Sequence, residues 1–245
     1  MRLIVLCSIA ETWQKTEAFL EKLDRLFSRM PEQDCSIWLV QDGALPPPPD
    51  WSSFAPSSAL GTHIVELLGF HGSTKAVAAA LAYISLDLEL DYEAILLIER
   101  QEDVCAEDIA TVLETAQRQP EIIIAGDSSK RSQPIFHYFF SALTRTLIGQ
   151  RLRRSPIIFL PRSAAEALCQ SSHTSCHLSA TISKLRLPHS SVRLPKAKLF
   201  VMNRGALAGW TENLLKAVTV FRENFAMRGA GLSAIGFLLS LTAVL

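Results

Sequence analysis

The stretch Ala94-Ile95-Leu96-Leu97-Ile98-Glu99-Arg100-Gln101-Glu102-Asp103 is the strongest indication of the fold of this chain. An apolar run stops abruptly at a cluster of charged and amide side chains. A strand buried on both faces of a parallel sheet has this composition, with polar groups at its carboxyl end. Open α/β sheets bind ligands in the crevice outside those ends. The acids after Ile98 therefore mark a candidate site for a divalent cation and, through it, a diphosphate.

Apolar segments alternate along the chain with segments of helical periodicity. The expected strands cover 2–7, 36–40, 62–68, 95–98 and 121–125, and the expected helices cover 12–30, 74–86 and 106–118. Strands that alternate with helices predict a right-handed, mostly parallel α/β sheet. The proline run at 46–49 breaks any regular element, so we expect a stiff extended loop there.

The net charge is zero, but basic and acidic residues are distributed unevenly along the chain. Fourteen of the 24 Lys and Arg residues, but only three of the 24 Asp and Glu residues, lie between Leu143 and Arg228. A basic segment followed by an apolar tail predicts an anionic partner, which could be a lipid headgroup, a lipid phosphate or a nucleic acid. The alternative is an ordinary solvated basic face.

Two segments have the composition of membrane contacts. The segment from Pro134 to Gly149 is rich in Phe and Leu and is followed closely by arginines, which is typical of an interfacial amphipathic helix and also of a core helix. Residues 229–245 carry no charge and would rise about 25 Å as a helix, against a hydrocarbon core of about 30 Å. We expect a short C-terminal membrane anchor, with a buried or interfacial helix as the alternative.

Several common motifs are missing from the sequence. The order Gly72-Ser73-Thr74-Lys75 reverses the phosphate loop, which needs Lys before Ser or Thr. No Gly-x-Gly-x-x-Gly run follows the first strand, and there is no Gly-x-Ser-x-Gly elbow, so a dinucleotide site and a serine hydrolase lack support. The five cysteines are scattered, which favours a reducing cytosol. One metal-like cluster fits no standard zinc spacing; it comprises Cys169, His173, Cys176 and His177.

Three acids each follow one of the expected strands, and these are Glu11, Asp42 and Glu99. In a parallel sheet such positions converge on one edge. Asp42 could accept hydrogen bonds from a base or ribose, or it could satisfy the backbone of its own turn. Glu99 could ligate a metal or pair with a neighbouring cation.

The order of these motifs over about residues 2–200 resembles the family 2 glycosyltransferases with the GT-A fold, especially the polyprenyl- and dolichyl-phosphate sugar transferases. Residues 4–11 are similar to the family's opening strand, and Glu11 matches its closing glutamate. Asp42 and Gly43 match the end of its Val-Asp-Asp-Gly-Ser, while Gln41 replaces the first acid. The remaining similar segments are 69–81 with Lys75, 98–108, 123–131 with Arg131, and the amphipathic stretch 136–153.

The resemblance implies a GT-A-like, mostly parallel sheet flanked by helices, with C-terminal amphipathic or hydrophobic helices. It also implies a nucleotide-sugar donor, a divalent cation (Mg²⁺ or Mn²⁺) and direct displacement at the anomeric carbon. The family's Asp-x-Asp falls on Glu99-Arg100-Gln101, so we expect Glu99 and Gln101 at the metal and Arg100 replacing part of its charge. Glu102 or Asp103 are alternative ligands. The residues expected to hold the donor are Glu11, Asp42, Gly43, Lys75 and Arg131. Together with Arg131, three further arginines are expected to hold the donor or a lipid phosphate, and these are Arg145, Arg151 and Arg153.

The resemblance further divides the chain by role. We expect residues 1–133 to bind the nucleotide-sugar, residues 134–228 to form the basic acceptor and membrane-interface half of the same domain, and residues 229–245 to anchor it. The expected acceptor is a lipid phosphate or the membrane surface at the cytoplasmic face, rather than nucleic acid, and an associated membrane protein stays open as a partner. The altered acidic motif supports a second hypothesis, an inactive binding or scaffold protein; a third is an unrelated nucleotide-binding α/β protein.

Overall fold

The computed structural model describes residues 1–9, 13–30, 32–43, 61–69, 71–87, 89–99, 101, 104–119, 121–127, 145–146, 155–194, 215–223, 226–228, 230 and 233. Its elements follow in the order β1 (Arg2–Ser8), α1 (Trp13–Phe27), β2 (Asp34–Gln41), β3 (Gly61–Glu66), α2 (Ser73–Leu86), β4 (Ala94–Ile98), α3 (Ala106–Arg118), β5 (Ile122–Asp127), β6 (Ile157–Pro161), α5 (Arg162–Cys169), α6 (Leu178–Lys184) and β7 (His189–Leu194).

The strands form one seven-stranded sheet in the order β3-β2-β1-β4-β6-β5-β7. β1 runs parallel to β2 and β4, β2 runs parallel to β3, and β5 runs parallel to β7. β6 lies antiparallel between β4 and β5. The expected mostly parallel α/β sheet is confirmed. β6 and β7 lie in a segment where the periodicity had predicted no strand.

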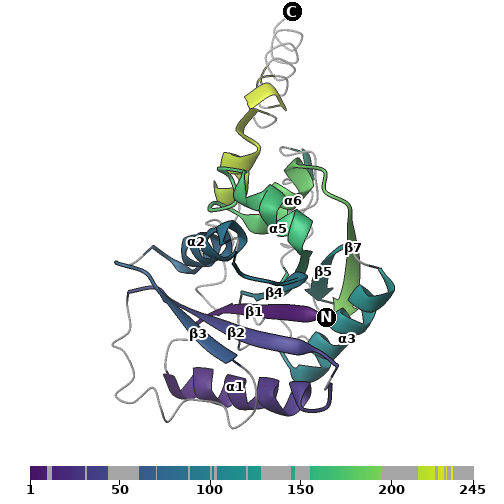
Figure 1. The fold of residues 1–245 in the computed structure, drawn as a ribbon. Coiled ribbons are helices and arrows are strands. Elements are labelled where there is room, and N and C mark those ends of the chain that lie inside the picture. Colours follow the sequence, from purple (N-terminus) through teal and green to yellow (C-terminus); the bar gives the residue numbers. More distant parts are fainter. Residues whose placement is uncertain are drawn as a thin grey trace, which may run out of the picture.

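Helices cover both faces of the sheet, as Figure 1 shows. On one face, α1 and α3 place Leu23 and Val112 in a core that includes Leu96. On the other face, α2, α5 and α6 form a second core in which Leu81 packs with Leu97. Successive strand residues point to opposite faces of the sheet. Because helices cover both faces, every residue of β4 is buried. Each such Leu contributes about 1.5–3 kcal/mol when it is fully buried.

The loop after β4 leads into α3 through a capping arrangement. The carboxylate of Asp108 accepts a hydrogen bond from the Cys105 N–H at 3.3 Å and one from the Cys105 thiol at 3.0 Å. Glu107 and Asp108 lie in the first turn, where the helix dipole favours negative charge. The predicted helix 106–118 is confirmed by α3, and its fixed start defines the far end of the β4–α3 loop.

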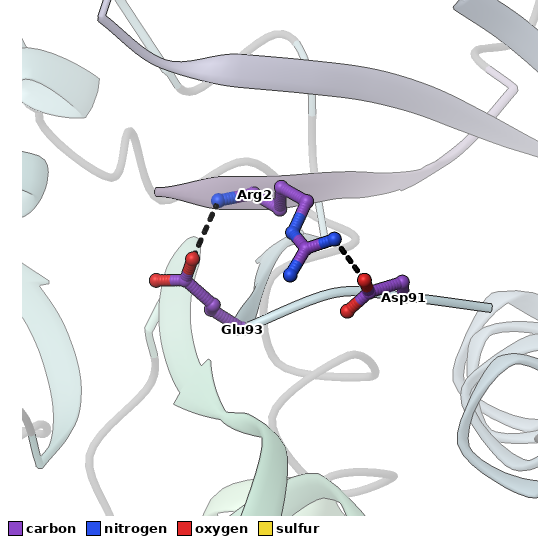
Figure 2. Close-up of polar contacts among 3 residues, drawn as sticks. All are labelled: Arg2, Asp91 and Glu93. Carbon is purple, nitrogen blue, oxygen red and sulfur yellow. Dashed lines mark hydrogen bonds and ion pairs between the residues drawn. The ribbon is translucent and has the colours of Figure 1, made fainter.

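An exposed polar cluster joins β1 to the segment before β4 (Figure 2). The Arg2 backbone N–H donates to a carboxylate oxygen of Glu93 at 3.4 Å, and the Arg2 guanidinium forms an ion pair with Asp91. The Glu93 N–H donates to Arg2 O at 2.9 Å. These contacts lie at the amino ends of β1 and β4, so they stabilise the edge of the sheet opposite the carboxyl ends.

The C-terminal segment 215–223 packs on α6. Ala217, Val220 and Phe221 are buried against Ala180. The ammonium group of Lys184 donates to Val220 O at 2.8 Å. Within the described residues, no helix has the length and apolar character needed to cross a membrane. The predicted anchor 229–245 lies almost wholly outside those residues.

Candidate functional site

The carboxyl ends of three parallel strands form the candidate site. β1 ends at Ser8, β2 at Gln41 and β4 at Ile98. Because these strands are hydrogen-bonded neighbours running in the same direction, their ends share one edge of the sheet. The Ile9 N–H donates to Val40 O at 3.0 Å, so the chain leaving β1 stays beside β2. The parallel pairing of β1 with β2 and with β4 thus brings Asp42, which follows β2, and Glu99, which follows β4, to a common edge of the sheet.

Asp42 holds the start of α2 against the end of β2. One carboxylate oxygen accepts the His71 N–H at 2.8 Å, and the other accepts the Gly72 N–H at 2.7 Å. Gly72 is the residue before the first turn of α2 and has a positive φ of 84°. A carboxylate at a helix amino end also interacts favourably with the helix dipole. Asp42 therefore fixes the β3–α2 loop through both of its oxygens.

Gly43 permits a close approach between the β2 and β3 exit loops. Its φ is +57°, and a Cβ at this position would lie 2.6 Å from both the carbonyl carbon and the carbonyl oxygen of Gly69. Real side chains do not tolerate such a contact with backbone, so this position requires glycine. The Leu67 N–H donates to Gln41 O at 2.9 Å, which adds a second link between the same loops.

Gln101 turns inward, toward the end of β1. Its side chain is 6% exposed, and its Nε2 donates to Ser8 O at 2.6 Å. Its Oε1 is buried and accepts no hydrogen bond from the described residues. Burial raises the pKa of the neighbouring Cys7 thiol to about 12, and a hydrogen bond from Gln101 partly opposes that rise. The amide of Gln101 thus joins the β4–α3 loop to β1.

Glu99 and Lys75 also border this edge. Glu99 is half-buried, its N–H donates to Pro156 O at 3.0 Å, and its carbonyl accepts from Ser8 Oγ at 3.5 Å. These bonds fix its backbone between β1 and β6. Lys75 is exposed in the first turn of α2, which follows the loop that Asp42 holds.

Several predicted residues lie outside the described part of the chain, so their expected roles stay predictions. They are Glu11, Arg100, Glu102, Asp103, Arg131, Arg151 and Arg153. Arg145 is described and exposed, and its carbonyl accepts a hydrogen bond from Arg228 at 3.3 Å. The residues that the structure brings together at the edge are therefore Asp42, Gly43, Glu99 and Gln101, with Lys75 on α2.

The described residues of the edge do not fit a divalent cation. Mg²⁺ and Mn²⁺ take about six ligands, mostly oxygens that include carboxylates. No group of three or more His, Cys, Asp or Glu able to hold a metal occurs among the described residues. Gln101 offers one neutral, buried oxygen, and Asp42 uses both of its oxygens on backbone N–H groups. The cysteine and histidine cluster at 169–177 likewise forms no metal group.

The hydrogen bond between Gln101 and Ser8 could not be predicted from the sequence. The one available signal was an amide at the place of an expected acid, since an amide can donate a hydrogen bond and a carboxylate cannot. The backbone N–H groups of His71 and Gly72 were missed for a different reason. Backbone donors carry no sequence signature, although Gly72 before an expected helix was compatible with an amino-terminal turn.

The strand order, the single reversed strand and the helices on both faces define a GT-A-like α/β fold. No protein-family model and no curated protein matches the chain. Among solved structures, it resembles a mannosyltransferase from Pyrobaculum calidifontis in complex with GDP-Man and Mn²⁺, with a TM-score of 0.55, 12% identity, and coverage of 99% of this chain and 79% of that chain.

A second structure with the same architecture is 4-diphosphocytidyl-2C-methyl-D-erythritol synthase from Anaerococcus prevotii DSM 20548. Its TM-score is 0.51 and its identity is 9%, with coverage of 87% of this chain and 96% of that chain. The similarity to both structures is one of fold.

Proposed function

We propose that this chain is a divergent glycosyltransferase that moves a sugar from a nucleotide-sugar donor to a lipid phosphate or another membrane-associated acceptor. The observation that carries the proposal is the shared edge of β1, β2 and β4, where Asp42 and Glu99 follow the two parallel strands that flank β1 in a GT-A-like sheet. The mannosyltransferase of the same fold binds GDP-Man, which supports a nucleotide-sugar as the donor.

The donor's diphosphate would meet positive charge at this edge. We assign that charge to Lys75 on α2 and, from the sequence, to Arg100 and Arg131. Glu99 would accept hydrogen bonds from hydroxyl groups of the donor. A divalent cation here would need Glu99 together with acids outside the described residues. Displacement at the anomeric carbon expels a nucleoside diphosphate, and fixed basic groups stabilise the charge that develops on it.

The acceptor side would face an anionic membrane surface, at its cytoplasmic face. The Arg228 guanidinium donates to Thr146 O at 3.0 Å and to Arg145 O at 3.3 Å, so Arg228 lies beside residues 145–146. Leu215 and Met227 expose 66% and 72% of their surface, and Met227 directly precedes Arg228 in the sequence. Exposed apolar side chains combined with arginines suit the boundary between lipid headgroups and acyl chains.

Flotation with vesicles tests the membrane part of the proposal. We expect the full chain to float with vesicles that contain phosphatidylserine, and to stay at the bottom with neutral vesicles. Replacing Arg145 and Arg228 with Ser should weaken flotation, while the same change at the exposed Arg118 of α3 should not. Equal flotation with neutral and anionic vesicles would contradict the assigned headgroup charge.

A second function, a binding or scaffold protein without transferase activity, is favoured by two observations. Both oxygens of Asp42 bind backbone N–H groups, and Gln101 stands where a second acid is expected. Such a protein would bind a nucleotide or a membrane partner without catalysing transfer.

A transfer assay separates the two functions. Sugar nucleotides with a labelled sugar are incubated with the protein and a polyprenyl phosphate, and labelled lipid is extracted. We expect transfer from at least one donor, and a fall of about a hundredfold in Glu99→Ala. The control is Glu17→Ala on the exposed face of α1, which should transfer normally. Nucleotide binding without transfer from any donor would favour the scaffold.

A further inference from the structure

The outer face of α2 is apolar along most of the helix. The inner face packs residues such as Leu81 and Ile84 into the second core, in the layer that also contains α5 and α6 (Figure 1). The residues of 75–86 that are not buried form what we call the α2 stripe, and they are Lys75, Ala78, Ala79, Ala82, Tyr83 and Leu86. A surface helix normally carries charged and polar residues on its outer face. The α2 stripe, in which Lys75 is the one charged residue, instead has the composition of a covered face.

Two large side chains dominate the α2 stripe. Tyr83 and Leu86 expose 57% and 74% of their surface. The Tyr83 ring lies 6.2 Å from the Trp38 ring, centroid to centroid, and Trp38 in turn stacks on His63 at 4.6 Å. Tyr83 is therefore supported by aromatic neighbours from β2 and β3, while more than half of it faces solvent. Exposed apolar patches of this kind mark contact surfaces, and Tyr is frequent among the residues that anchor protein interfaces.

The two ends of the α2 stripe differ in charge. Lys75 lies in the first turn of α2, whereas Asp87 follows its last turn and accepts a hydrogen bond from the Glu89 N–H at 3.0 Å. Carboxylates beside Leu86 would be repelled by an anionic lipid surface, so a membrane suits this face poorly. A second copy in the antiparallel orientation suits it well, because Lys75 of each copy then meets the acids of the other. The helix dipoles favour the same orientation.

The spacing of the residues allows both kinds of contact at once. Lys75 and Asp87 lie equally far from Leu81 along the chain, and so do Ala79 and Tyr83. In a two-fold interface, a residue that contacts a second residue across the axis is contacted by it in return. An axis at the level of Leu81 therefore pairs Lys75 with Asp87 at both ends of the interface. It also places Tyr83 of each copy over Ala79 of the other, where the small methyl group leaves room for the ring.

We propose that this chain forms a two-fold homodimer through antiparallel contact between the α2 stripes of two copies. Burial of the apolar residues supplies the free energy of association, and the charges set the orientation, because exposed ion pairs contribute little to affinity. Two short helices bury less than the roughly 1,600 Å² of a standard interface, so we expect a weak dimer with a Kd of about 1–100 µM. The proposal does not depend on the proposed function.

Sedimentation velocity of the full chain over a range of concentrations tests the dimer. It is run without nucleotide, because the proposed function assigns Lys75 to the donor's diphosphate. We expect Ala79→Glu to raise the dimer Kd at least about tenfold, since the axis brings the two new carboxylates together. Ala18→Glu, at an exposed alanine of α1, is the matched control and should leave the Kd unchanged. A natural chain that stays monomeric up to about 200 µM, well above the expected Kd, or a dimer that Ala79→Glu does not weaken, would overturn the proposal.

A charge exchange tests the antiparallel orientation. Lys75→Glu and Asp87→Lys should each raise the dimer Kd about tenfold, because each places like charges at both ends of the interface. The combined variant restores opposite charges, so we expect its Kd to return close to that of the natural chain. This recovery also excludes a purely local effect of losing the bond between Asp87 and the Glu89 N–H. Unchanged dimers in both single variants, or a combined variant as weak as either, would refute the antiparallel pairing.

Flotation distinguishes a second copy from lipid as the occupant of the α2 stripe. With vesicles that contain phosphatidylserine, we expect Ala79→Glu to float as the natural chain does. Reduced flotation of Ala79→Glu, together with unchanged sedimentation, would assign the α2 stripe to the membrane and overturn the proposal.

Discussion

The backbone N–H of Gly72 donates a hydrogen bond of 2.7 Å to the carboxylate of Asp42, and this bond connects the end of β2 to the start of α2. The other oxygen of Asp42 binds the neighbouring His71 N–H at 2.8 Å. Asp42 thus satisfies backbone donors before α2, as turn aspartates often do, and it does so across two separate loops. The contact places the first turn of α2, with Lys75, beside the candidate donor site.

The first prediction concerns this contact. In Asp42→Asn, one of the two N–H groups faces an amide NH₂ in place of an oxygen, so we expect the free energy of unfolding to fall by about 1–3 kcal/mol. Urea unfolding measures the change. Asp91→Asn is the matched control: Asp91 forms an exposed ion pair with Arg2, and such pairs contribute at most about 1 kcal/mol. A loss at Asp42 no larger than that at Asp91 would contradict the structural role.

The second prediction concerns Gly43. Alanine at this position would combine a positive φ with a Cβ 2.6 Å from Gly69 backbone atoms. We expect Gly43→Ala to lower the free energy of unfolding by roughly 2 kcal/mol or more. In Gly61→Ala the new Cβ would meet only the His63 side chain at 3.5 Å, an ordinary contact, so the change should be small. Similar effects of the two substitutions would show that the loops do not approach as described.

The third prediction concerns the C-terminal segment. The Lys184 ammonium lies 2.9 Å from His173 Nε2 and donates to Val220 O at 2.8 Å. Lys184→Met removes this bond, so we expect faster amide hydrogen exchange in the segment 215–223. Lys22→Met, on the exposed face of α1, should leave that exchange unchanged. Unaltered exchange in Lys184→Met would mean that the apolar contacts of Val220 and Phe221 alone hold the segment.

The fourth prediction concerns stability at high pH. Burial raises the pKa of Cys7 and that of Cys35 from 9.0 to about 12. Between these values the unfolded chain loses protons that the folded protein keeps, so stability is full below about pH 9 and falls as the pH rises toward about 12. Urea unfolding at about pH 7.5 and about pH 10.5 should show a smaller loss in Cys7→Ala than in the natural chain. The same loss in both proteins would contradict a buried thiol.

The sequence was sufficient for the parts of the fold that local composition encodes. The apolar run at β4 and the helix pattern of α3 gave elements that the structure reproduces closely, because burial on both faces and a 3.6-residue period leave clear traces. β6 was missed. Its apolar residues Ile157–Leu160 resemble a short buried segment of any kind, and its antiparallel insertion between β4 and β5 depends on pairing between distant residues.

The candidate site shows the same limit. The positions of Asp42 and Glu99 follow from the strand ends, so they could be predicted from the apolar runs alone. The direction in which a side chain points after the end of a strand could not be predicted from the sequence. Gln101 was expected to face the crevice, and the structure turns it inward because Ser8 O needs a donor. The inward orientation of Gln101 depends on the carbonyl of Ser8, which lies far away in the sequence.

In our proposal, the edge formed by β1, β2 and β4 binds a nucleotide-sugar donor. Isothermal titration calorimetry of the full chain with UDP, GDP, CDP and their sugars measures this binding. We predict stoichiometric binding of one nucleotide class, weakened about tenfold or more by Glu99→Ala and unchanged by Glu17→Ala. Absence of binding by every nucleotide at millimolar concentration, or binding that Glu99→Ala leaves unchanged, would contradict the claim.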